Sequence, residues 1–175
     1  MNRMVSFDNQ FAAYAFVVLV GLSFSSCGYY SFTGATIPEH LGTVAVPLVD
    51  DNSLSTISGL DEEMTQLLID RFVRQTRLSL SPDADQADAL LVASISRYIN
   101  APTSVSGNER ATRNRVTITV SVTYTDQVTN QSLLEQSFSG FEEYDPLDPS
   151  SEAAAASTAL SKIADDIFTA ATSNW

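Results

Sequence analysis

The sequence is poor in the residues from which most catalytic and metal sites are built. Its 175 residues include one cysteine, Cys27, and one histidine, His40. These two side chains cannot supply a His/Cys zinc site, which needs three or four protein ligands. No glycine-rich phosphate loop precedes a predicted helix, and no Gly-x-Ser-x-Gly motif is present. We therefore expect no metal, no other cofactor and no enzymatic activity.

Basic residues are also scarce, with 9 Lys and Arg against 21 Asp and Glu and a formal net charge of -12. Nucleic acids and anionic lipid headgroups attract proteins mainly through Lys and Arg side chains. This balance argues against nucleic acid as a partner and against docking on anionic lipid. No apolar run reaches the roughly 20 residues that a membrane-spanning helix needs.

A shorter apolar run near the N-terminus is typical of a secretory signal peptide. Residues 11–24 (FAAYAFVVLVGLSF) carry no charge, and the small residues Ser25 and Ser26 follow before Cys27. Residues 22–27 (LSFSSC) resemble a bacterial lipobox, in which the cysteine sulfur receives a diacylglycerol and becomes the new N-terminus. We expect residues 1–26 to be a lipoprotein signal peptide and Cys27 to carry a covalent lipid.

The alternative for Cys27 is a free thiol that follows an ordinary cleavage site. An unpaired exposed thiol would be a liability in an oxidising compartment, and the chain offers no disulfide partner. Lipidation explains why this cysteine is present and alone. Two or three acyl chains give a stable anchor, since each buried methylene contributes roughly 0.8 kcal/mol.

The mature chain is expected to form one domain that follows a short linker. Residues 27–42 are interpreted as a lipidated linker because glycine and proline recur in them. The remaining residues, 43–175, are enough for one domain with a core of its own.

Two amphipathic helices are predicted in this domain. The first follows Ser58, which is spaced from Asp61 as in a capping box. The second spans roughly 151–172, capped by Ser150 or Asp148. Apolar residues recur every three or four positions in both helices. The stripes are Leu60, Met64, Leu67, Leu68 and Phe72 in the first, and Ala155, Leu160, Ile163, Ala164, Ile167, Phe168 and Ala171 in the second.

The predicted strands surround the first helix and precede the second. Residues 115–125 show the clearest alternation, with apolar side chains on one face and hydroxyl side chains on the other. A long polar segment, 100–114, is expected to separate this strand from the one before it. The other predicted strands are residues 43–49, 78–80, 89–99 and 133–141.

This order of elements predicts an α+β fold. The economical packing is a two-layer sandwich, with two helices on one face of a mostly antiparallel sheet of about four strands. The opposite face would then be polar but uncharged, which suits either solvent or another protein surface. Its central strand contributes Thr117, Thr119, Ser121, Thr123 and Thr125.

Four arginines form the most distinctive basic feature of this acidic chain. Arg110, Arg113 and Arg115 lie within six residues, and Arg97 ends the preceding predicted strand. We expect them to gather at one end of the sheet. Arginine forms forked hydrogen bonds with phosphate and carboxylate groups. They therefore either bind an anionic ligand or pair with acids such as Glu109 and Glu142.

An acidic cluster follows the last predicted strand and comprises Glu142, Glu143, Asp145 and Asp148. Paired carboxylates can serve a hydrolase or a calcium site. Their spacing matches neither arrangement, and acidic turns are common in proteins. We interpret this cluster as a solvated turn.

Short motifs along the chain resemble those of the LPS-assembly lipoprotein family LptE, in its branch outside the proteobacteria. Residues 27–34 (CGYYSFTG) resemble the C-G-Y-x-F-x-G opening of that family. Residues 44–47 (VAVP) resemble its first strand. The resemblance continues in order to the end of the chain. The further matching segments are 71–72, 76–78, 87–91, 95–98, 115–120, 124–126, 138–141, 144–145, 166–168 and 173–175.

The resemblance implies a fold of two helices on a four-stranded sheet and a place in the outer membrane. Members of the family sit as a plug within LptD, the β-barrel that exports lipopolysaccharide (LPS), help it to assemble, and bind LPS through basic residues. The resemblance thus implies an LptD-type partner, LPS as ligand, and anchorage to the periplasmic face of the outer membrane. It also favours LPS binding by Arg97, Arg110, Arg113 and Arg115, and it suggests the hydroxyl face as the partner face.

Two other functions remain open from the sequence. One is a free periplasmic lipoprotein that carries a lipid or glycan without a barrel partner. The other is a hydrolase that uses Glu142, Glu143 or Asp145.

Overall fold

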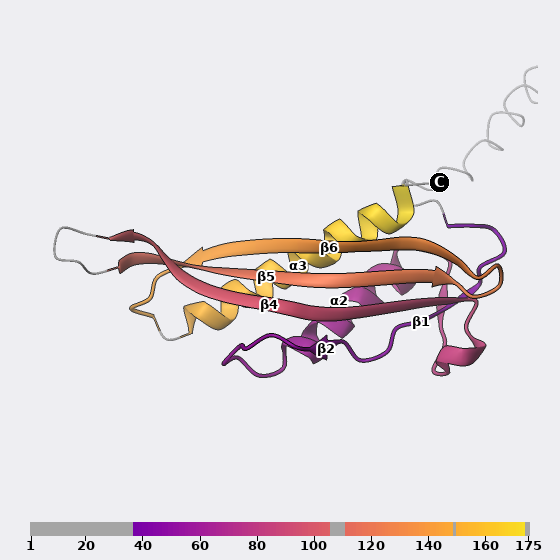
Figure 1. The fold of residues 1–175 in the computed structure, drawn as a ribbon, viewed down its shortest axis with the longest axis horizontal. Helices are drawn as coiled ribbons and strands as arrows, with labels where there is room; N and C mark the ends of the chain where they lie inside the picture. The colour runs from indigo at the N-terminus through magenta and orange to yellow at the C-terminus, as the bar shows by residue number, and fades with distance from the viewer. Residues whose placement is uncertain (1–36, 106–110, 149, 174–175) are drawn as a thin grey trace, which may run out of the picture. The chain divides into compact units, whose positions relative to one another are not determined.

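The computed structural model describes residues 37–105, 111–148 and 150–173. The expected signal peptide, Cys27, most of the expected linker and Arg110 lie outside these residues. Figure 1 shows a long twisted sheet with two helices behind it. The chain is α+β, as the sequence predicts.

Six strands form one mixed sheet. Three are long and antiparallel: β4 (Ala89–Val105), β5 (Ala111–Asp126) and β6 (Gln131–Tyr144). Three are short: β1 (Thr43–Ala45), β2 (Asp50–Asp51) and β3 (Ser79–Leu80). The main order is β3-β1-β4-β5-β6, and β2 pairs separately with β4.

The sheet differs from the expected four antiparallel strands. The β1 strand pairs in parallel with both β3 and β4, and β2 also runs parallel to β4. Strands of two or three residues are too short to show an alternating pattern, so their pairing is decided by the packing around them. The strand expected over residues 43–49 stops at Ala45, before Pro47, which cannot donate to a ladder.

The β4–β5 hairpin is much longer than the sequence suggests. The segment 100–114, expected to be a polar loop, is mostly strand, because β4 continues to Val105 and β5 begins at Ala111. Register shifts beyond Ile95 interrupt the regular pairing in this arm. Each shift changes which side chains face the core, so the apolar and polar alternation is lost although the ladder continues.

The α-helices among residues 37–173 are α2 (Leu60–Arg74) and α3 (Ser151–Ser173). The expected capping box at Ser58 is wrong, because Gly59 is the N-cap of α2, has φ 83°, and makes no side-chain capping bond. Glycine reaches that left-handed conformation without a steric penalty. Between the helices, Nε of Arg71 lies 2.6 Å from Oδ1 of Asp165.

The core lies between the helices and one face of the long strands. The apolar set of β5 is buried there, with Phe72 of α2 in edge contact with both Tyr124 and Phe168. The α3 helix passes close to Gly140 of β6, where an added Cβ would lie 2.7 Å from the Ala159 carbonyl oxygen. The buried residues of β5 are Val116, Ile118, Val120, Val122 and Tyr124.

Candidate functional site

The sheet face opposite the helices carries the hydroxyl side chains predicted from the alternation of β5. Neighbouring residues of a strand point to opposite faces, so burial of the even-numbered residues directs the odd-numbered ones outward. This hydroxyl face continues onto β6, which places Ser137 opposite Ser121 and Ser139 opposite Thr119. The contributing residues of β5 are Thr117, Thr119, Ser121, Thr123 and Thr125.

Hydrogen bonds between strands organise the hydroxyl face. The hydroxyl oxygens of Thr119 and Ser139 are 2.9 Å apart, and those of Ser121 and Ser137 are 3.0 Å apart. Next to them the face is hollowed into an open depression of about 520 Å³. Its lining comprises Val92, Ala93, Ser94, Ser121, Val122, Thr123, Glu135, Gln136 and Ser137. The face therefore offers hydroxyl hydrogen-bonding groups, together with one acid, Glu135, on an ordered backbone.

Three large apolar side chains also lie on the outer face. Val92 is 42% exposed, Ile99 43% and Phe141 53%. Val92 pairs with Thr123, while Ile99 and Phe141 lie on either side of Thr117. Ile99 and Phe141 therefore form a small apolar patch around Thr117, and Val92 lies apart from it.

The predicted arginine cluster is only partly brought together. Arg113 and Arg115 lie two residues apart on β5 and share the outer face. Arg97 shares that face but pairs with Thr119, which places it roughly 13 Å from Arg115 along the strand direction. Arg97 and Arg113 are both exposed.

Arg115 has the most contacts of the described members of this cluster. Its Nη2 lies 2.7 Å from Oε1 of Glu143, and its guanidinium carbon lies 4.6 Å from the centre of the Phe141 ring. Its Nε is buried and has no hydrogen-bond partner among the described residues. Arg115 is thus oriented by an acid and an aromatic ring on β6, and part of its donor capacity is unused.

The acidic residues after the last strand have separate partners. Nζ of Lys162 lies 2.5 Å from Oε2 of Glu142, and this contact lowers the pKa of that carboxyl group. Glu143 pairs with Arg115. Asp145 and Asp148 accept backbone N–H bonds from Leu147 and Ser150 in the following turn. The described residues hold no group of three or more His, Cys, Asp or Glu side chains placed to bind a metal.

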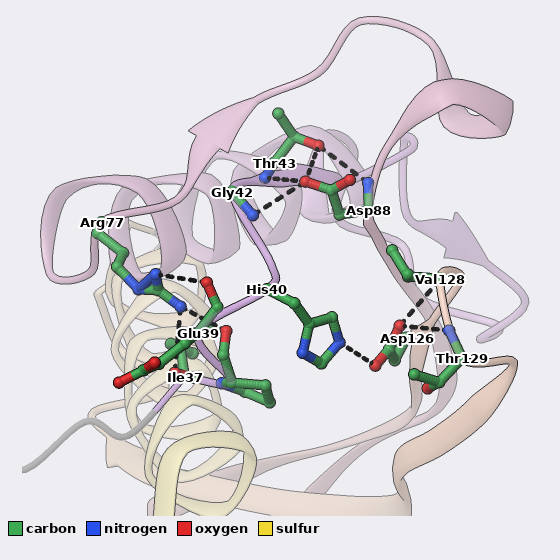
Figure 2. A network of polar contacts seen from close by, with 11 residues as sticks. Ile37, Glu39, His40, Gly42, Thr43, Arg77, Asp88, Asp126, Val128 and Thr129 are labelled. Atoms are coloured by element: carbon green, nitrogen blue, oxygen red, sulfur yellow. Dashed lines mark hydrogen bonds and ion pairs between the residues drawn. The ribbon is translucent and has the colours of Figure 1, made fainter.

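A second polar network fixes the segment that precedes β1 to one end of the sheet (Figure 2). Nε2 of His40 lies 2.6 Å from Oδ2 of Asp126, whose side chain is only 3% exposed. Burial alone would raise the pKa of Asp126. Bonds from Thr129, His40 and the Val128 N–H outweigh that effect and lower the pKa to about 2.

Asp88 and Arg77 add further contacts to this network. Oδ2 of Asp88 accepts bonds from the N–H groups of Gly42 and Thr43, each at 2.9 Å, and the first of these is the main cause of its lowered pKa. The guanidinium of Arg77 donates to the carbonyl oxygens of residues 37, 38 and 39.

The end of the expected linker is therefore part of the folded domain. Ile37 and Leu41 are buried in the core, and His40 is 44% exposed while its ring bonds to the buried carboxylate of Asp126. Sequence analysis missed this because its partners lie 45 and 86 positions away along the chain. The apolar pair Ile37 and Leu41, spaced by four, was the one local signal.

Comparison with known proteins decides the family. A family model described as LptE, lipopolysaccharide-assembly, matches residues 41–171, which is most of the folded domain. The chain belongs to the LptE family. It is thus a protein of lipopolysaccharide assembly, and the family role is not enzymatic. No curated protein matches the chain by sequence.

Solved structures share the fold at low sequence identity. The hypothetical protein CT253 from Chlamydia trachomatis has a TM-score of 0.53 at 12% identity, covering 77% of this chain and 99% of that one. Uncharacterized lipoprotein B from Nitrosomonas europaea has a TM-score of 0.52 at 16% identity, covering 83% and 87%. Protein XCC0632 from Xanthomonas campestris has a TM-score of 0.53 at 11% identity, covering 77% and 88%. These likenesses concern the fold.

No helix among the described residues is long and apolar enough to cross a membrane.

Proposed function

We propose that this LptE-family protein is an outer-membrane lipoprotein that assembles with an LptD-type β-barrel, plugs it, and assists LPS transport to the outer membrane. The observation that carries the proposal is the hydroxyl face. A long sheet face left uncovered by either helix presents Ser and Thr side chains together with Val92, Ile99 and Phe141. The Ser and Thr part of this surface can be enclosed by a polar barrel lumen without burying unpaired charge, whereas Arg97, Arg113 and Glu135 on the same face would need polar partners in the lumen.

In this proposal, residues 1–26 are removed as a signal peptide and Cys27 carries the lipid that holds the protein at the periplasmic side of the outer membrane. The network around His40 supports a defined attachment, because it fixes the chain from Ile37 onward to the domain. About ten residue steps separate Cys27 from Ile37, so even a fully extended linker spans at most about 35 Å.

LPS binding is proposed at the arginine end of the outer face. Arg115 lies beside the exposed ring of Phe141, and Arg113 is two residues further along β5 on the same face, so a cationic group and an apolar surface are in contact. LPS presents phosphates next to acyl chains, which matches that combination. Arg110 and Arg97 are the further proposed members of this site.

Co-purification tests the proposed function. The full lipidated chain, extracted in mild detergent, should recover the LptD-type barrel of the same cell, and depletion should leave LPS in the periplasm. A matched variant, Thr123→Arg, introduces a charge on the hydroxyl face and should reduce recovery of the barrel. Gln66→Arg on the exposed side of α2 is the control. Repeated recovery of bound lipid or glycan without a barrel would instead favour a free carrier.

A further inference from the structure

The edges of the sheet are protected very unequally. Natural proteins protect exposed edges with short strands, charges, prolines and bulges. The β3 edge has two residues, and the β2 strand consists of two acidic residues. The free part of β4 beyond Ile95 contains Arg97, Pro102 and several register shifts. Each of these edges therefore carries at least one feature that discourages an added strand.

The β6 edge has fewer of these features. It is fourteen residues long, and it contains no proline and no Lys or Arg. It ends the sheet order, and its pairing with β5 is regular except at a single shift between Tyr124 and Thr125. Between Gln131 and Phe141 the strand holds one charged residue, Glu135, in a chain of net charge -12. This edge is thus a regular template with little charge.

Two contacts show which backbone groups face outward. Ser96 donates its hydroxyl to the Thr119 carbonyl, so that carbonyl points toward β4. In an antiparallel ladder, the residues of β5 on either side of Thr119 then bond to β6. The backbone N–H and C=O groups of Phe138 and Gly140 on β6 therefore point toward β5. Independently, Lys162 donates to the Phe141 carbonyl at 3.3 Å from outside the ladder. Both contacts therefore indicate that the backbone groups of the odd-numbered residues of β6 point away from β5.

Within the part of the chain that the structure describes, the N–H and C=O groups left without a ladder partner therefore belong to Glu135, Ser137 and Ser139, with Lys162 beside Phe141 at the far end. Because these residues also point their side chains to the outer face, a strand added here would extend the hydroxyl face. Every second side chain of that strand would lie beside Ser137, Ser139 or Phe141.

We infer that the open edge of β6 binds an extended segment of the barrel partner by β-strand addition. The inference rests on the proposed function. Charge selects this occupant over a second copy of the chain, since each copy carries a net charge of -12 and would bring its own Glu135 and Glu143. The incoming segment is uncharged or basic, with a basic residue near Glu135 and an apolar residue near Phe141.

Proline substitution at outward positions tests the inference. Proline at Ser137 or Ser139 removes an N–H that does not bond to β5, so we expect the fold to be retained. An added strand would lose one hydrogen bond and would clash with the proline ring. We expect Ser137→Pro and Ser139→Pro to lower the affinity of the full lipidated chain for the barrel by on the order of tenfold. Ser137→Thr and Ser139→Thr keep the N–H and should bind as wild type does. Normal barrel binding by both proline variants, with unchanged circular dichroism and melting temperature, would overturn the inference.

Photo-crosslinking supplies a measurement that does not depend on proline. A photoreactive residue at Ser139 should link to the barrel, whereas one at Gln66 on the far side of α2 should not. Crosslinks from Thr123 but none from Ser139 would remove the strand-addition inference and leave the proposed function standing. Failure of the wild-type chain to recover any barrel would remove the proposed function itself. A homodimer crosslink from Ser139 would identify a second copy as the occupant and overturn the inference.

Discussion

Nε2 of His40 lies 2.6 Å from Oδ2 of Asp126, and this contact joins the segment before β1 to the turn that follows β5. The other oxygen of the same carboxylate accepts the N–H groups of Val128 and Thr129. One nearly buried acid thus holds both the β5–β6 turn and the point where the chain enters the domain.

Acid should weaken this junction. The pKa of Asp126 is lowered to about 2, below its ordinary value of about 3.9. A lowered pKa stabilises the fold above the unfolded value, so the stabilisation is lost as pH falls from about 4 to about 2. We expect Asp126 to contribute about 2 kcal/mol to the loss of unfolding free energy over that range. Urea unfolding of wild type and Asp126→Asn at several pH values measures it. Parallel pH profiles for the two proteins would contradict the assignment.

Gly140 should be intolerant of any side chain. A Cβ there would lie 2.7 Å from the backbone oxygen of Ala159 and 2.8 Å from Cγ1 of Ile163. Because α3 would have to move away from β6, Gly140→Ala should lower the free energy of unfolding by about 1–3 kcal/mol. Gln136→Ala, at an exposed position of the same strand, is the control and should change it by less than about 0.5 kcal/mol. Equal stabilities of the two variants, measured by chemical denaturation, would show that α3 packs less closely than the structure has it.

Substitution of the arginines near the start of β5 should affect LPS binding more than the stability of the fold. Arg110→Ala, Arg113→Ala and Arg115→Ala together should weaken LPS binding by on the order of tenfold or more, since charge-assisted bonds to phosphate are lost. Thermal stability should change little, because the pair between Arg115 and Glu143 is partly exposed. Arg74→Ala, an exposed arginine on α2, is the matched control. Unchanged LPS affinity in the triple variant would rule out this site.

Lipidation at Cys27 can be tested separately from folding. Metabolic labelling with a fatty-acid analogue should mark the wild-type chain, and Cys27→Ala should abolish both the label and membrane association. Ser31→Ala, four residues further along, should leave both unchanged. Label retained in Cys27→Ala would place the modification elsewhere.

Much of the architecture can be read directly from local patterns. The alternation of residues 115–125 identified both the buried face and the hydroxyl face of β5, because successive side chains of any strand point to opposite sides. The apolar stripes of α2 and α3 were equally clear, since each is long enough to show a helical period. The family resemblance, confirmed over residues 41–171, follows from the order of short motifs along the chain.

Other features were decided by contacts between distant residues. The parallel strands β1, β2 and β3 are too short to carry a pattern, and the hairpin arm of β4 and β5 loses its alternation at register shifts. The arginines near in sequence were expected to cluster, yet the register of β4 on β5 separates Arg97 from Arg115. No local signal indicates that the β6 edge is open, because edge position depends on the order of strands in the sheet.

The sequence by itself determined the two helices, the central strands, the scarcity of catalytic residues and the expected lipid attachment at Cys27, because each depends on neighbours within a few positions. Only the tertiary structure decided that residues 37–42 belong to the domain, that His40 bonds to Asp126, and that no strand of the described residues pairs with the outer edge of β6. Those features depend on backbone and side-chain groups far apart in the chain, which folding alone brings within hydrogen-bonding distance.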